Sequence, residues 1–141
     1  MHTVTVHGLP APKGSRKFVG MSKKGHALIV EDCAKTKPWT EAVKWAILET
    51  LPGLHLSGPL AVTIHFTLPK PKSAPKRRRT YPDRKPDIDK LMRSTLDALT
   101  ASGLIEDDAR IISIAAGKFY PNEDSMGMES PGARIFVSEV G

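Results

Sequence analysis

The spacing of apolar residues changes several times along this chain, and the order of those spacings restricts the fold more than any other feature. Apolar and polar residues alternate over 3–7 and 59–68, which predicts two half-buried strands. Over 36–51 and 88–99 apolar residues recur every third or fourth position, which predicts two helices with one buried face each. Short apolar segments at 17–19 and 27–30 predict a hairpin, and those at 109–120 and 133–140 predict two further strands.

The resulting order is strand, hairpin, helix, strand, helix, strand, strand. This order favours a two-layer α/β (α+β) arrangement in which the helices pack on one mixed sheet. With 141 residues, the chain is long enough for one domain with a real core and too short for two ordinary ones. We therefore expect a single domain over 1–141.

Residues at the helix ends give finer expectations. Thr36 is placed to be the N-cap of the first helix, with Pro38 in its first turn and Trp39 on its core side. Gly103 is placed to be the C′ residue that ends the second helix.

Composition restricts the cellular setting. The single cysteine, Cys33, excludes an internal disulfide and a multi-cysteine zinc site, which suits a reducing compartment. No apolar run approaches the roughly 20 residues that a membrane span needs, and the first residues lack the apolar region of a signal peptide. We expect a cytoplasmic protein without a membrane partner.

The net charge of +6 is concentrated in one segment. From Lys70 to Lys85 eight cations face a single acid, Asp83, for a local charge of +7, while the rest of the chain sums to −1. Five of the twelve prolines lie in 69–86, which predicts an irregular loop. A dense positive segment attracts a polyanion, most commonly nucleic acid; the alternative is a solvated loop whose charge only aids solubility.

Acidic residues gather directly after this basic loop. Asp87 and Asp89 follow Pro86 at the expected start of the second helix, and Glu106, Asp107 and Asp108 follow its expected end. On a regular helix two residues apart point about 200° away from each other, but at an extended entry they share one side. The simpler alternative is that Asp87 or Asp89 is only an N-cap.

The chain order raises a geometric objection to one acidic cluster. A helix and the strand that follows it run roughly antiparallel, which puts the end of the strand, and not Asp108 at its beginning, beside Asp87. The objection weakens if the strand starts after a return loop, or if Asp108 reaches its ligand on another chain or on the other side of the sheet. The sequence leaves these alternatives open.

Three converging carboxylates would favour a hard cation. Without Cys or His ligands, Mg²⁺, Mn²⁺ or Ca²⁺ is favoured over zinc, and such a site can activate water for displacement at phosphorus. Arg93, four residues after Asp89 and four before Asp97, either contacts the scissile phosphate or forms an exposed i,i+4 ladder with these two acids.

The sequence KPDIDKLMRSTLDALTASGLIEDDARI and the lysine that follows closely resemble the RusA-type Holliday-junction resolvases. The shared pattern over 85–118 is a D-x-D that opens a helix, an L-D-A-L within it, a D-D pair after a glycine turn and a lysine about ten residues on. The loop GLPAPKGSR after the first strand is also similar to that family. Residues 20–60 carry no diagnostic motif.

The resemblance implies a homodimeric, Mg²⁺-dependent endodeoxyribonuclease, with Mn²⁺ as a substitute, that nicks branched DNA such as a four-way junction symmetrically. Asp87, Asp89 and Asp108 match the family's metal-binding catalytic carboxylates. Arg93 stands where the best-known members have a lysine, which keeps the charge and changes its geometry. Lys90 stands where some members have asparagine. The candidate DNA-binding residues are Lys13, Arg16, Lys76, Arg77, Arg78, Arg79, Arg84, Lys85, Lys90 and Lys118.

Two other functions compete with this interpretation. A protein on the same scaffold that binds branched DNA without cutting it would also carry the basic loop, and the departures at Lys90 and Arg93 leave room for it. A structural or interaction protein would use the acids only as caps. Incubation with a labelled four-way junction, with and without Mg²⁺, separates the first from a nuclease, and Asp89→Asn separates the second.

Overall fold

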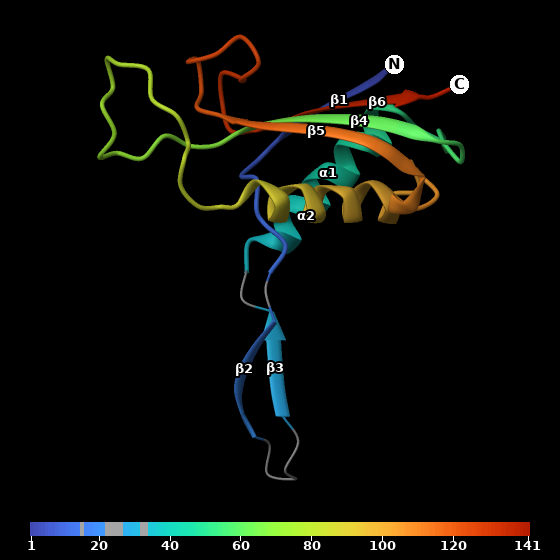
Figure 1. Ribbon diagram of the computed structural model, residues 1–141, viewed down its shortest axis with the longest axis horizontal. Helices are drawn as coiled ribbons and strands as arrows, with labels where there is room; N and C mark the ends of the chain where they lie inside the picture. Colours follow the sequence, from blue (N-terminus) through green and yellow to red (C-terminus); the bar gives the residue numbers. More distant parts are fainter. Residues whose placement is uncertain (15, 22–26, 32–33) are drawn as a thin grey trace.

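A four-stranded mixed sheet is the centre of the molecule (Figure 1). In the computed structural model the described residues are 1–14, 16–21, 27–31 and 34–141, and side chains are described outside 15–33. The strand order is β1-β6-β4-β5, with β4 and β5 parallel and the other neighbours antiparallel. The strands are β1 (His2–His7), β4 (Leu60–Thr67), β5 (Ile111–Phe119) and β6 (Gly132–Glu139).

Two helices, α1 (Thr36–Thr50) and α2 (Ile88–Ala101), cover the same face of this sheet (Figure 1). The predicted two-layer arrangement of helices on one mixed sheet is therefore confirmed. The predicted hairpin also forms: β2 (Arg16–Met21) pairs antiparallel with β3 (Ala27–Glu31), and the two extend away from the sheet as a separate ribbon.

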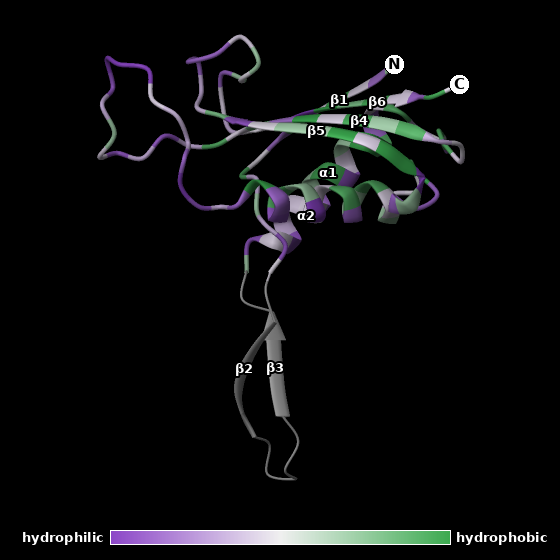
Figure 2. Ribbon diagram, in the orientation of Figure 1, coloured by the Kyte–Doolittle hydropathy of each residue, from purple (hydrophilic) through white to green (hydrophobic). Residues whose placement is uncertain are grey.

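The core lies between the sheet and the helices. Every second residue of β4, from Leu60 to Phe66, is at most 2% exposed, as the alternating pattern predicts. Figure 2 shows hydrophobic residues along the central strands and on the parts of the helices that face them. Trp39 of α1 is buried, as predicted, and its indole Nε1 donates to Thr95 Oγ1 of α2 at 3.1 Å. This bond supplies the partner that a buried indole needs and fixes α1 against α2.

Two helix-end expectations had different outcomes. Gly103 follows the C-cap residue Ser102 with φ of +85°, so its prediction as the C′ residue is confirmed. The prediction of Thr36 as an N-cap is wrong, because α1 begins at Thr36 and Lys35 precedes it as the capping residue. The Thr36 hydroxyl instead donates to the carbonyl of Pro12 at 2.6 Å. The hydroxyl therefore joins α1 to the loop after β1.

The proline-rich segment 69–86 contains no helix or strand, as predicted. It leaves the end of β4, returns to the start of α2, and is largely hydrophilic (Figure 2). In the part of the chain that the structure describes, neither helix is long and apolar enough to cross a membrane.

The β4–α2–β5 connection determines where the site residues lie. Because β4 and β5 are parallel, α2 must run back antiparallel to both of them. The start of α2 therefore lies at the carboxyl end of β5, and the end of α2 lies where β5 begins. This arrangement is the one that the sequence raised as an objection to a single acidic cluster.

Candidate functional site

The amino-terminal end of α2 presents two exposed carboxylates. Asp87 is the N-cap residue, with extended backbone (φ −68°, ψ 137°), yet its side chain makes no capping hydrogen bond. Asp89 lies in the first helical turn. The two acids are thus on the extended entry and the first turn, as the spacing after Pro86 predicts, and Asp87 is not used as a side-chain cap. Both carboxylates are exposed to solvent and to a ligand.

Lys118, at the end of β5, fixes the backbone that leads into Asp87. Its Nζ donates to the carbonyl oxygens of Arg84 at 2.7 Å and Pro86 at 2.9 Å. On the other side of α2, the amide of Lys13 donates to the carbonyl of Lys90 at 2.9 Å. The start of α2 is therefore joined to β5 and to the loop after β1.

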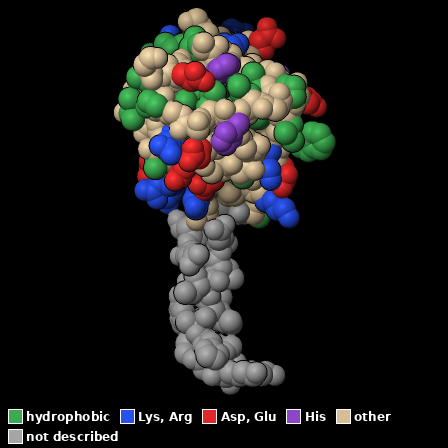
Figure 3. Space-filling view, turned by 90° about the vertical axis from the view of Figure 1, so that its right-hand side faces the viewer, with side chains coloured by type: hydrophobic (Ala, Val, Ile, Leu, Met, Phe, Trp, Pro, Cys, Tyr) green, Lys and Arg blue, Asp and Glu red, His purple; other side chains and the backbone are tan. Residues whose placement is uncertain are grey.

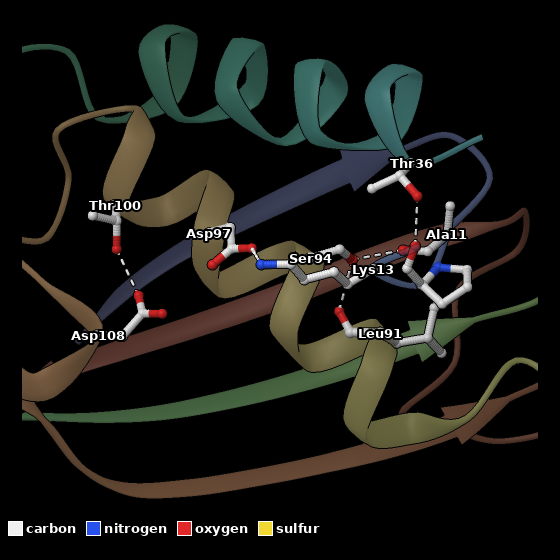
Figure 4. Close-up of polar contacts among 9 residues, drawn as sticks. Ala11, Lys13, Thr36, Leu91, Ser94, Asp97, Thr100 and Asp108 are labelled. Carbon is white, nitrogen blue, oxygen red and sulfur yellow. Dashed lines mark hydrogen bonds and ion pairs between the residues drawn. The ribbon is translucent and has the colours of Figure 1, made fainter. Parts of the chain in front are cut away.

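The carboxyl-terminal end of α2 carries the third acid. Asp108 begins a short 3-10 helix, η1 (Asp108–Arg110), directly before β5. Its Oδ1 accepts a hydrogen bond of 2.6 Å from Thr100 Oγ1 in the last turn of α2 (Figure 4). Asp108 is half-buried, whereas the adjacent Asp107 is exposed. The hydrogen bond orients one carboxylate oxygen and leaves the other for a ligand.

The structure does not bring Asp108 together with Asp87 and Asp89 within one chain. From Asp89 to Thr100 the helix rises about 16 Å, whereas ligands of one Mg²⁺ each lie about 2 Å from the ion. In the described part of the chain, no three His, Cys, Asp or Glu side chains form a group that could hold a metal. The donor set itself, oxygens without Cys or His, suits Mg²⁺ or Mn²⁺, but each end of α2 supplies only part of it.

Arg93 is exposed one turn after Asp89 on α2. The alternative prediction was an i,i+4 ladder of Asp89, Arg93 and Asp97. Asp97 instead forms an ion pair with Lys13, with 3.0 Å between Oδ2 and Nζ (Figure 4). Within the described residues, no ion pair joins Arg93 to either acid. A phosphate contact by Arg93 stays a prediction.

The basic segment is held by a second loop, 121–131, between β5 and β6. Oε1 of Glu123 accepts from Lys70 Nζ at 2.8 Å and from the amide of Thr80 at 3.2 Å. Asp124 forms an ion pair with Arg79. The hydrogen bond from Lys70 is the largest of the effects that lower the pKa of Glu123, and the hydrogen bond from the amide of Met126 is the largest that lowers the pKa of Asp124. Both carboxylates are therefore stabilised in their charged forms.

The other predicted DNA-binding residues lie in three kinds of position. Lys76, Arg77, Arg78, Arg84 and Lys85 are exposed, whereas Lys90 is half-buried. Lys13 and Arg79 are exposed but pair with acids, and Lys118 is half-buried against the two carbonyls. The side chain of Arg16 lies outside the described residues. Among the described residues, the exposed cations that form no ion pair with an acid are therefore in two places: Lys76 to Arg78 within the basic segment, and Arg84 and Lys85 just before Asp87.

Sequence reasoning did not identify Glu123, Asp124 or Thr100 as part of this region. The sequence PNEDSMGMESPG around the first two is typical of a loop, and nothing in its spacing indicates contact with residues 43 to 53 positions earlier. Thr100 lies eight residues before Asp108, so their contact depends on the turn at 102–107. The feature of the sequence that could have indicated this contact is the polar side chain of Thr100 in the last turn of the helix.

Strand β5 is an edge of the sheet and carries exposed apolar side chains. Ile112 is 64% exposed and Ile114 38%, and among the described strands β5 pairs only with β4, which leaves its other edge without a partner strand there. An edge with these properties pairs readily with another chain unless it is protected. Figure 3 shows the side of the molecule that lies on the right in Figure 1. On this side acidic, basic and hydrophobic side chains are interspersed.

Comparison with known proteins supplies a further observation. The sequence profile of a family described as "Endodeoxyribonuclease RusA" matches residues 8–129, which include both ends of α2 and the basic segment. A protein of Bacillus subtilis (strain 168), described as "Uncharacterized protein YqaN", is 25% identical over 145 residues, covering 96% of this chain and 94% of that protein.

Proposed function

Because the chain belongs to the RusA family of endodeoxyribonucleases, we propose that it is a Mg²⁺-dependent nuclease that resolves four-way DNA junctions by paired symmetric nicks. The observation that supports this most is at the start of α2. Asp87 and Asp89 are exposed there, neither side chain caps the helix, and the segment that precedes them carries cationic side chains. Mn²⁺ is the expected substitute for Mg²⁺ because it takes the same oxygen ligands.

We further propose that the active form is a homodimer in which each centre takes residues from two chains. The reason is that Asp108 lies at the opposite end of α2 from Asp87 and Asp89. A two-fold axis perpendicular to α2 and β5 reverses the direction of both elements in the partner. Antiparallel pairing of the β5 edges would therefore bring Asp108 of one chain to the end of β5 in the other, where Lys118 contacts Pro86.

Such pairing would also cover Ile112 and Ile114. Burial of apolar side chains is favourable by about 25 cal/mol per Å², and the β5 edge gains backbone hydrogen bonds. The same contact would therefore complete the carboxylate set and remove the exposed apolar edge.

Each group would have a separate task in the reaction. Asp87 and Asp89 of one chain and Asp108 of the other would hold the cation, which when bound supplies an activated water and offsets charge at the phosphate. Thr100 would orient Asp108 through its hydrogen bond, and Lys118 would hold the backbone at Asp87. Arg93, one turn further along α2, would contact the phosphate. Lys76, Arg77 and Arg78 would bind the phosphates of the junction arms.

The test is subunit complementation between Asp89→Asn and Asp108→Asn. Each homodimer has two defective centres, whereas a mixed dimer has one centre with both changes and one with neither. Random mixing makes half of the dimers mixed, so nicking of a labelled four-way junction with Mg²⁺ should recover to about a quarter of the wild-type rate. A co-expressed mixture of Asp87→Asn with Asp89→Asn is the matched control: both changes lie on the same side of the shared centre, so every mixed dimer keeps two defective centres and nicking should not recover.

The outcomes separate the parts of the proposal. If the mixture is as inactive as either homodimer, the shared centre is wrong. If the wild-type protein binds the junction but does not nick it with Mg²⁺ or Mn²⁺, the protein is a non-cleaving junction binder. If it does neither, the junction is not its substrate.

A further inference from the structure

A pocket opens directly beside the entry to α2. It has a volume of about 270 Å³, near the lower limit for pockets that hold small organic groups. The loop after β1, the end of β4, the basic segment and Tyr120 form its walls. Its place next to Pro86 puts it one residue from Asp87.

The walls of the pocket are unusually rich in proline. Six of the thirteen lining residues are prolines, and Leu9, Ala11, Leu68 and Tyr120 add further apolar surface. Proline has no backbone N–H, so these six residues offer ring faces and no main-chain donors. Such walls favour a flat apolar group that stacks, and not a group recognised by many hydrogen bonds.

The charge of the pocket indicates a ligand attached to an anion. Its charged lining residues are Lys35, Arg84 and Lys85, all exposed, and none of the described residues that line it is acidic. A nucleotide combines a flat apolar base with a phosphate. A pocket of about 270 Å³ has room for a single base.

Hydrogen bonds fix both walls of the pocket to the helices and the sheet. Ser94 Oγ of α2 donates to the carbonyl of Ala11 at 2.6 Å, and Thr36 Oγ1 of α1 donates to that of Pro12 at 2.6 Å (Figure 4). Lys118 holds the opposite wall through Arg84 and Pro86. Tyr120 is only 6% exposed, so the floor is also fixed. The pocket is therefore rigidly positioned relative to Asp87 and Asp89.

We propose that this pocket binds one unstacked nucleobase adjacent to the scissile phosphate and contributes to the choice of cleavage position. This rests on the proposed nuclease function. Enzymes that act on nucleic acid commonly hold an extruded base between apolar and aromatic side chains. Stacking of one base contributes about 5- to 160-fold to affinity for any base, which is large enough to favour the positions of a mobile junction at which a base is unstacked.

The first experiment places 2-aminopurine at successive positions around the nick of a four-way junction and uses the Asp89→Asn protein, which should bind without cutting. One position is expected to show a change in fluorescence that its neighbours lack. Leu9→Trp, which fills the mouth of the pocket from a side chain that is 41% exposed, should remove this change. Leu48→Trp, on the exposed face of α1 at 53% exposure, is the matched control and should keep it.

The second experiment measures cleavage by the Leu9→Trp protein with the active-site acids intact. Preference among positions is expected to fall by at least about 5-fold while Mg²⁺-dependent nicking continues. Junction binding and nicking without any position-specific fluorescence would overturn the pocket proposal and leave the nuclease intact. If the wild-type protein neither binds nor nicks the junction, the proposed function is wrong, and so is this inference.

A third measurement tests the other type of ligand that a proline-lined pocket suggests. Amide resonances of Leu9, Arg84 and Tyr120 are followed while a single-stranded tetranucleotide or a proline-rich peptide is added. We expect shifts with the tetranucleotide. Shifts with the peptide alone would overturn the assignment to a nucleobase.

Discussion

The two ends of α2 differ in what surrounds their carboxylates. At the amino-terminal end Asp87 and Asp89 are exposed, flanked by Arg84 and Lys85, and bordered by a pocket. At the other end Asp108 is half-buried and accepts a hydrogen bond from Thr100. The first end has positive charge and space for DNA, whereas the second has one oriented acid beside an apolar strand edge. Each end has what the other lacks, which is the basis for proposing that two chains combine them.

The largest expected effect comes from removing a carboxylate at the exposed end. Asp89→Asn should reduce the nicking rate by about 100-fold or more, because a metal centre contributes several kcal/mol to catalysis. Junction affinity, measured by gel shift, should be unchanged or higher, since an acid near the DNA is removed. Asp97→Asn is the control, and it should nick at a rate close to that of the wild type. Unchanged cleavage by Asp89→Asn would remove the metal-site hypothesis.

The next effect tests the strand edge beside Asp108. Ile112→Glu should convert the proposed dimer to a monomer in sedimentation analysis, because a charge would be placed in the proposed contact. The nicking rate should fall in proportion to the loss of dimer. Trp45→Glu is a matched control: Trp45 is also 64% exposed but lies on α1. The far-UV circular dichroism of both variants should match that of the wild type. A dimer that persists in Ile112→Glu would show that β5 is not the contact.

A smaller effect is expected from Thr100→Val, which keeps the shape of the side chain and removes the hydroxyl. Groups that orient a metal ligand typically contribute 10- to 100-fold, so the nicking rate should fall by about 10-fold. The free energy of unfolding should fall by about 1 kcal/mol, the usual value for one hydrogen bond. Ser102→Ala, two residues on, loses a hydroxyl bond to Leu99 and should leave the rate unchanged. Equal rates for both variants would contradict an orienting role.

The smallest effect concerns the anchoring of the basic segment by Glu123. Folding lowers the pKa of Glu123. The stability that its charged form contributes is therefore fully present above the ordinary glutamate pKa, and it is lost as pH falls through the pKa of the folded state. The protection factor for hydrogen exchange at the Thr80 amide should therefore be high at neutral pH and fall below about pH 4. Glu123→Gln should show low protection already at neutral pH, and Glu129→Gln, in the same loop, should behave as the wild type.

Periodicity was sufficient to predict most of the fold. Alternation in β4 and helical spacing in α2 each indicate which side is buried, and the structure buries those sides. Ile88 is the exception on α2, at 36% exposure, because it is the first residue of the helix and lies at the end of the core. The N-cap of α1 was misplaced by one residue because Thr36 bonds to Pro12, a partner 24 positions away that local sequence does not reveal.

The candidate site was predictable only as separate pieces. Carboxylates before and after a helix are visible in the sequence, and the direction of α2 relative to β5 follows from the parallel pairing of β4 and β5. The contacts of Glu123 and Asp124 were not predictable, because they depend on two irregular loops whose paths are set by the sheet. The pocket beside Pro86 was hidden for the same reason, since five parts of the chain that are distant in sequence form it.

The length of α2 has a geometric consequence for the proposed dimer. If each centre joins the start of one α2 to the end of the other, the two centres lie roughly one helix length apart, about 20 Å for 14 residues. The length of α2 would then determine the distance between the two cuts. Adding two turns to α2 would move the centres apart by about 11 Å and change which pairs of phosphates can be cut in one binding event.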